Sequence, residues 1–96
     1  LKKKKIQDIF FQNFVSDASA ILLITSVIGR SQIKYGLKSL KFSFIEAGHL
    51  GQNVLLYATK LDIGACAICG YDGQKAEKLL GIDGLSEGIV YVIALG

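Results

Sequence analysis

Apolar residues recur at helical spacing at the start of the chain and then give way to continuous apolar runs. The first group of apolar side chains consists of Ile6, Ile9, Phe10, Phe14 and Val15. Their spacing predicts an amphipathic helix over residues 2–15 that packs on a core. Residues 20–28 are an unbroken, β-branched run that ends before Gly29, which is typical of a buried strand.

The middle of the chain contains its longest helical pattern. Residues 29–42 carry glycines and charges among scattered apolar positions, so we expect a connecting segment that is partly exposed. Residues 43–62 have apolar side chains around most of the circumference of a helix, which predicts a long and largely buried helix.

The last third of the chain predicts two strands and a short helix between them. Residues 64–71 are a small-residue strand that ends in glycine and tyrosine, and Asp72 can cap a helix that runs to about Leu80. Residues 89–95 form a third strand with strong β propensity. Helices and strands that alternate in this way predict an α/β or α+β sandwich with helices covering a sheet.

Composition adds that something else should cover part of this domain. The chain has 96 residues, room for one small domain, and 51% of them are hydrophobic. The excess apolar surface implies a partner chain or a missing segment. Because the sequence begins at Leu1 and contains no methionine, we expect it to be an excerpt of a longer protein.

The charge pattern argues against a nucleic-acid-binding protein. The lysine run at residues 2–5 accounts for the whole of the +3 net charge, and no aromatic residues alternate with it. We interpret the run as a solvated helix end, and binding of this basic helix to an anionic membrane surface is the alternative. No apolar run is long enough for a membrane helix or resembles a signal peptide, so we expect a soluble, cytoplasmic protein.

Three groups of residues could carry chemistry. Cys66 and Cys69 have the spacing of a redox pair or half of a zinc site, but residues three apart on a strand point to opposite faces. We therefore predict a structural role for them and no metal site. Glu46, His49 and Asn53 form a polar stripe on the long helix, where His49 could act as an acid or base but is more simply a hydrogen-bonded structural residue.

The third group is Lys34 and Tyr35 in the connecting segment, close to Arg30. A buried amine beside a phenol could orient a carbonyl or phosphate and move a proton. Surface charge is the simpler interpretation, and the spacing alone leaves both open.

The sequence from Lys34 to Gly96 resembles the C-terminal half of one flavoprotein family. The matching segments are Lys34-Tyr35-Gly36, Glu46-Ala47-Gly48-His49-Leu50-Gly51-Gln52-Asn53, Leu61-Asp62-Ile63-Gly64-Ala65-Cys66, Cys69-Gly70-Tyr71-Asp72, Leu79-Leu80-Gly81 and Ala94-Leu95-Gly96. In order and spacing they resemble the nitroreductase-like FMN flavoproteins, and especially the SagB-type dehydrogenase branch that includes azoline oxidases. The resemblance implies an α+β fold, a sandwich of helices around a mainly antiparallel sheet, of which residues 1–96 would be a partial copy.

The resemblance also implies a function and a set of site residues. Members are homodimers with FMN at the subunit interface. The resemblance also implies that the turn matching Ala67, Ile68, Cys69 and Gly70 lies against the flavin ring. A backbone N–H near Cys69 or Gly70 would donate to flavin N5. In the azoline-oxidising branch the pair that matches Lys34 and Tyr35 is associated with proton removal while hydride passes to FMN.

The expected activity is therefore hydride transfer through FMN, to or from a small-molecule or peptide substrate, with NAD(P)H as a candidate donor. The residues that hold the FMN phosphate in the family would precede Leu1, so we expect the 96 residues alone to bind FMN weakly. A cofactor-free dimerisation or interaction module derived from the same fold is the alternative.

Overall fold

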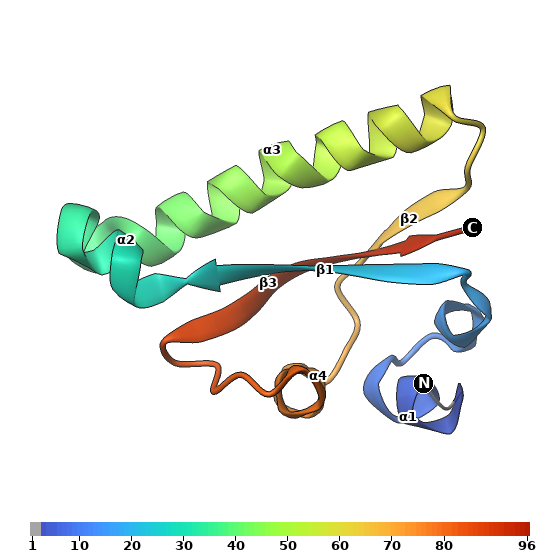
Figure 1. The fold of residues 1–96 in the computed structure, drawn as a ribbon, viewed down its shortest axis with the longest axis horizontal. Helices are drawn as coiled ribbons and strands as arrows, with labels where there is room; N and C mark the ends of the chain where they lie inside the picture. Colours follow the sequence, from blue (N-terminus) through green and yellow to red (C-terminus); the bar gives the residue numbers. More distant parts are fainter. Residues whose placement is uncertain (1–2) are drawn as a thin grey trace.

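The chain forms a three-layered arrangement in which a small sheet lies between one long helix and a group of short helices. A computed structural model describes residues 3–96, and at Ser31 and Gln32 it describes only the backbone. Helix α3 (Ser39–Lys60) covers one face of the sheet, whereas α1 (Lys3–Ile9) and α4 (Gly73–Leu80) lie on the opposite side (Figure 1). The α+β architecture predicted from the sequence is confirmed.

The described residues contribute three strands to this sheet, in the order β1-β3-β2. Strand β3 (Glu87–Leu95) is central and antiparallel to both β1 (Ala20–Val27) and β2 (Ala65–Ile68). On one side Ala20 pairs with Leu95 and Val27 with Glu87, and on the other Ala65 pairs with Leu95 and Ile68 with Val92. The short β2 therefore covers only the C-terminal half of β3.

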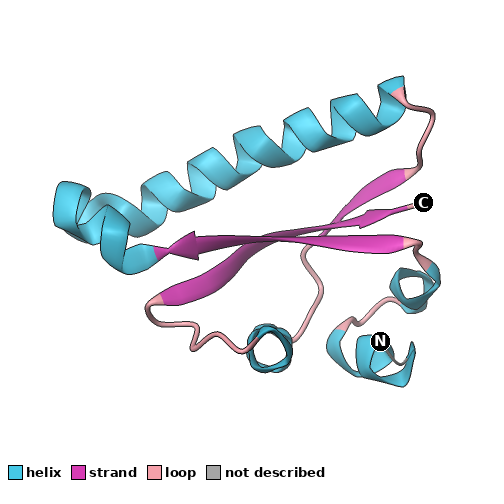
Figure 2. Cartoon of the chain, viewed as in Figure 1, coloured by secondary structure: helices cyan, strands magenta, loops and turns pink. Residues whose placement is uncertain are grey.

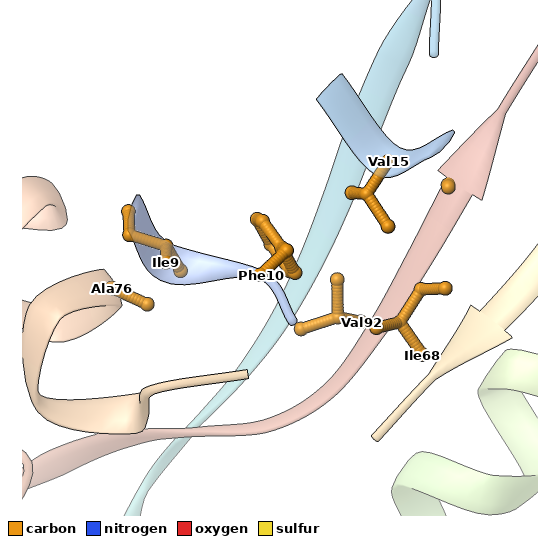
Figure 3. Close-up of a cluster of buried hydrophobic side chains, with 7 residues drawn as sticks. Ile9, Phe10, Val15, Ile68, Ala76 and Val92 are labelled. Atoms are coloured by element: carbon orange, nitrogen blue, oxygen red, sulfur yellow. The ribbon is translucent and has the colours of Figure 1, made fainter. Parts of the chain in front are cut away.

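The core lies between the sheet and the N-terminal segment, on the face turned away from α3. Its buried side chains are Ile9, Phe10, Val15, Ile68, Ala76, Val92 and Ala94. Figure 3 shows six of them converging from α1, the 3₁₀ helix η1 (Asn13–Asp17), both C-terminal strands and α4. This packing joins the N-terminal segment to the end of β2.

The N-terminal helix is shorter than the predicted helix over residues 2–15. Helix α1 ends at Ile9, because Phe10 forms an isolated antiparallel bridge with Tyr71 and leaves the helical path. A long-range pairing thus overrides the local helical pattern. The exposed Lys3, Lys4 and Lys5 are consistent with a solvated helix, and Lys2 lies outside the described residues.

The connecting segment predicted over residues 29–42 is mostly helical. It contains α2 (Ile28–Tyr35), the 3₁₀ helix η2 (Gly36–Lys38) and the first turn of α3. Helix α2 lies at the N-terminal end of α3, where β1 ends (Figure 1). Lys34 and Tyr35 therefore sit on a helix rather than in a loop.

The expectation that the long helix is largely buried was wrong for this chain. The sheet touches α3 along one narrow side, where the buried residues are the small Ser39, Ser43, Ala47, Gly51 and Ala58. Large apolar side chains on the other sides are exposed, among them Phe44, Leu50, Leu56 and Tyr57. A three-stranded sheet is too narrow to cover more than one side of α3.

None of the helices within residues 3–96 has the length and apolar character needed to cross a membrane.

Candidate functional site

The turn that follows β2 is held in place by the N-terminal segment. Beyond Ile68 the chain leaves the sheet and runs to α4 through the loop that Figure 2 shows. The N–H of Phe11 donates to the carbonyl of Gly70 over 3.1 Å, and the N–H of Asp72 donates to the carbonyl of Ile9 over 2.8 Å. These two backbone bonds together make the isolated Phe10–Tyr71 bridge, and they fix the path of residues 69–72.

The same turn contains two backbone N–H groups without an acceptor among the described residues. The carbonyl of Cys69 accepts from the N–H of Tyr71 over 3.1 Å, and the carbonyl of Gly70 is taken by Phe11. Within residues 3–96, no protein acceptor is found for the N–H of Cys69 or of Gly70. A fixed turn with two adjacent free N–H groups can bind an acceptor atom of a ligand without a particular side chain.

The surroundings of the turn are partly apolar. The ring of Tyr71 packs against Phe10 with centroids 6.0 Å apart. Burial raises the pKa of the Tyr71 phenol above its usual value, and the nearby Cys69 and Glu77 add to this effect. Tyr71 therefore stays protonated at neutral pH and keeps its hydroxyl donor.

Helix α4 begins directly after the turn. The Asp72 carboxylate accepts a hydrogen bond from the N–H of Lys75 over 3.2 Å, which is the N-cap expected from the sequence. Gly81, with φ of 75°, ends the helix in the left-handed conformation. The cap thus fixes the exit of the chain from the turn into α4.

Both cysteines have free, exposed thiols. Cys66 lies within β2, whereas Cys69 lies one residue beyond its end. In the described part of the chain, no three side chains of histidine, cysteine, aspartate or glutamate lie close enough together to hold a metal ion. Cys66 and Cys69 are not joined to each other by a disulfide in this structure.

Lys34 and Tyr35 lie side by side at the C-terminal end of α2. The Lys34 ammonium is 5.3 Å from the centroid of the Tyr35 ring, and the same ring meets Phe42 edge-on at 4.9 Å. Both side chains are exposed, and Tyr35 retains 43% of its accessible surface. The burial that a proton-transfer role requires is not provided by this chain alone.

The two predicted parts of the site are separated within one chain. Lys34 and Tyr35 lie near the start of α3, whereas β2 and the turn that follows it lie toward the other end (Figure 1). Glu46, His49 and Asn53 of the polar stripe are exposed on α3. One copy of these residues therefore does not form a single enclosed site.

The part that sequence reasoning missed is the segment that holds the turn. Phe10 and Phe11 fall inside the predicted helix, but the structure uses their backbone to fasten residues 69–72. The available signal was Phe11 itself, an apolar residue outside the periodic apolar positions of that helix.

Comparison with known proteins gives a consistent assignment. The family model described as "Nitroreductase family" matches residues 2–96. The chain belongs to the nitroreductase family. A protein of Methanocaldococcus jannaschii named as a nitroreductase is 30% identical over 71 residues, which cover 74% of this chain and 36% of the relative.

Solved structures support the fold. A nitroreductase homologue from Anabaena variabilis matches with a TM-score of 0.85 and 28% identity, over 98% of this chain and 19% of that chain. The E. coli microcin synthetase McbBCD, solved with truncated pro-MccB17 bound, matches with a TM-score of 0.75 and 20% identity. That match covers 79% of this chain and 29% of the other. In all three comparisons, this nitroreductase-family chain spans only about a third or less of the length of the protein it resembles.

The turn offers hydrogen-bond donors of the type that one edge of a flavin ring can accept. Flavin N5 and its neighbouring carbonyl oxygen are hydrogen-bond acceptors, and the free N–H groups of Cys69 and Gly70 are donors of matching type. Ala67 and Ile68 lie in β2 immediately before them, and Ile68 is buried in the core. By donor type, the N–H groups of Cys69 and Gly70 are compatible with the acceptor edge of a flavin ring.

Proposed function

We propose that this chain is part of an FMN-dependent oxidoreductase of the SagB type, in which residues 67–70, the end of β2 and the start of the turn, lie against the flavin ring. The observation that carries the proposal is the fixed turn with its two free N–H groups, together with membership of the nitroreductase family. Bound FMN supplies reversible two-electron chemistry, accepting or giving hydride at N5.

In this proposal the backbone N–H groups of Cys69 and Gly70 position and polarise the reacting edge of the ring. A backbone donor that is already fixed by Phe11 and Asp72 costs little reorganisation when charge develops nearby. The Cys69 thiol takes no covalent part, since a backbone donor works equally with any side chain at this position.

Lys34 and Tyr35 take the role of the proton-handling pair. When an azoline ring is oxidised to an azole, hydride leaves to the flavin and a proton leaves to a base, so that the ring loses two electrons and two hydrogens in total. The Lys34 amine, when unprotonated, or the Tyr35 phenolate can receive that proton, and the position of Lys34 over the Tyr35 ring keeps the two groups together.

A homodimer would unite the two parts of the site. Because Lys34 and the turn lie toward opposite ends of α3, a shared site needs one part from each of two copies. The exposed apolar side chains of α3 provide a surface for such pairing, and covering them would remove them from water. Dimerisation thus serves the oxidoreductase and does not call for a separate, cofactor-free function.

A peptide substrate is favoured by one neighbour in particular. The microcin synthetase has a truncated precursor peptide bound, and it shares this fold. We propose a peptide azoline as the substrate class, with a nitroaromatic compound reduced by NAD(P)H as the competing assignment.

The test uses the protein in its natural length, purified and mixed with FMN. We expect tight binding, visible absorbance that remains with the protein after gel filtration, and conversion of a thiazoline-containing peptide to the thiazole with loss of two mass units. A protein that takes up no FMN would overturn the proposal as a whole. Binding of FMN with NAD(P)H-dependent reduction of a nitroarene, and no azoline oxidation, would reassign the substrate.

A further inference from the structure

One large aromatic side chain lies next to the candidate donors and has no packing partner that explains it. Phe11 retains 71% of its accessible surface, although its neighbour Phe10 is part of the core. Its backbone N–H is bonded to the carbonyl of Gly70, which holds the residue beside the turn. The exposed ring is thus fixed beside the segment that carries the free N–H groups.

The contact between Phe11 and Gly70 is close. A Cβ placed on Gly70 would lie 3.6 Å from Cδ2 of the Phe11 ring, which is ordinary van der Waals distance. The N–H of Gly70 belongs to the same residue, so the Phe11 ring lies beside the residue that carries this donor. A planar ligand bound at the turn would therefore have the ring as a neighbour.

We infer that Phe11 is a flavin-contacting residue whose ring forms an apolar wall beside the N5 edge of the bound cofactor. The inference rests on the proposed function. An aromatic ring placed there packs favourably on the planar isoalloxazine and excludes water from the donor groups, which strengthens their hydrogen bonds. It also explains why a large apolar residue occupies a position that is exposed in this chain.

Phe14 provides a matched control. It is also an exposed phenylalanine of the N-terminal segment, at 45% of its accessible surface, but it lines a different hollow of about 320 Å³ beside Gly64 and Cys66. If the loss of any exposed phenylalanine from this segment weakened FMN binding, variants at Phe14 would show the effect as well as variants at Phe11.

The experiment measures FMN binding to the natural-length protein and to the variants Phe11→Leu, Phe11→Trp, Phe14→Leu and Phe14→Trp. Phe11→Leu keeps an apolar side chain and the backbone bond but removes the ring, so its Kd for FMN should rise about 3- to 10-fold, the range expected for one aromatic contact. Phe11→Trp should shorten the fluorescence lifetime of bound FMN, because an indole in contact with a flavin quenches it by electron transfer. The Phe14 variants should change neither quantity.

The outcomes separate the two proposals. If the unsubstituted protein binds no FMN, the proposed function fails and this inference fails with it. If FMN binds and the Phe11 and Phe14 variants match the unsubstituted protein in both Kd and lifetime, the proposed function stands and the role of Phe11 is overturned. Thermal unfolding of each apo variant shows whether a raised Kd reflects a lost contact or a damaged fold.

Discussion

The ring of Tyr91 in β3 lies directly against the backbone of Gly51 in α3. A Cβ on Gly51 would come within 2.5 Å of Cε2 and 2.7 Å of Cδ2 of that ring, closer than side chains approach one another. The missing side chain at Gly51 is therefore what allows α3 to lie close to the central strand. A second glycine on the same helix, Gly48, has nothing within 4 Å of the corresponding position.

This pair of glycines predicts opposite effects of the same substitution. Gly48→Ala should raise the free energy of unfolding by up to about 1 kcal/mol, because alanine favours a helix without meeting a neighbour. Gly51→Ala should lower it by about 1 kcal/mol net, because the cost of overpacking exceeds the same helical gain. Urea unfolding followed by circular dichroism measures both values.

A third variant attributes the loss to the ring. In a Tyr91→Leu background the aromatic atoms that meet Gly51 are gone, so the cost of Gly51→Ala should shrink. Equal costs in the two backgrounds would show that the Tyr91 ring is not what constrains position 51.

Asp72 should stabilise α4 through its cap. Asp72→Ala removes the acceptor for the N–H of Lys75 and should lower the free energy of unfolding by about 1 kcal/mol. Asp72→Ser keeps a capping oxygen and should therefore retain most of the free energy of unfolding that Asp72→Ala loses. If serine and alanine destabilise equally, the cap contributes nothing at this position.

Asp83 should make stability depend on acid pH. Its carboxylate accepts from the Ser86 hydroxyl and from the N–H groups of Leu85, Glu87 and Ser86, which together hold its pKa well below the usual value. The unfolded chain takes up a proton at this carboxyl near pH 4 but the folded chain does not, so the stabilisation is complete above about pH 4. It is lost as the pH falls further.

The test compares Asp83→Ala with the unsubstituted chain at neutral pH and at pH 2. At neutral pH the variant should have a lower melting temperature than the unsubstituted chain. At pH 2 this difference in melting temperature should be smaller. Asp8→Ala serves as the control, because in residues 3–96 no hydrogen bond to the Asp8 carboxylate is found, in contrast to the four at Asp83. A difference that stays constant with pH would contradict the role given to the ionised carboxylate.

Tyr35 can be tested for catalysis without disturbing its packing. Tyr35→Phe retains the ring that meets Phe42 and lies below Lys34, but it removes the hydroxyl. If the phenol transfers a proton, turnover should fall about 10²- to 10⁴-fold while the melting temperature stays unchanged. Tyr35→Ala, by contrast, should lower both, and full activity in Tyr35→Phe would remove Tyr35 from the proposed mechanism.

The strands were predictable from the sequence because their signals are local. The run at residues 20–28 and the closing run at residues 89–95 are β-branched and continuous, and both form strands close to the expected bounds. The cap at Asp72 was equally local. The strand predicted at residues 64–71 was too long, because β2 covers only Ala65–Ile68 and residues 69–71 already belong to the turn.

Other features depended on long-range contacts and were not readable from the pattern. Phe10 leaves the helical path because it pairs with Tyr71, which is 61 residues away. The exposure of α3 could not be inferred from its apolar circumference, since periodicity does not say how many sides of a helix are covered within one chain. The separation of Lys34 from the turn likewise follows from the path of α3 across the sheet.

The central strand of the described sheet comes after both of its neighbours in the chain. Every pairing that β1 and β2 make in the described sheet is with residues 87–95. For β1 these pairings join residues 60 or more positions apart, since Val27 pairs with Glu87 and Ala20 with Leu95. Pairings this distant in sequence form slowly, so a substitution that weakens β3 should delay the formation of the whole described sheet rather than of one edge.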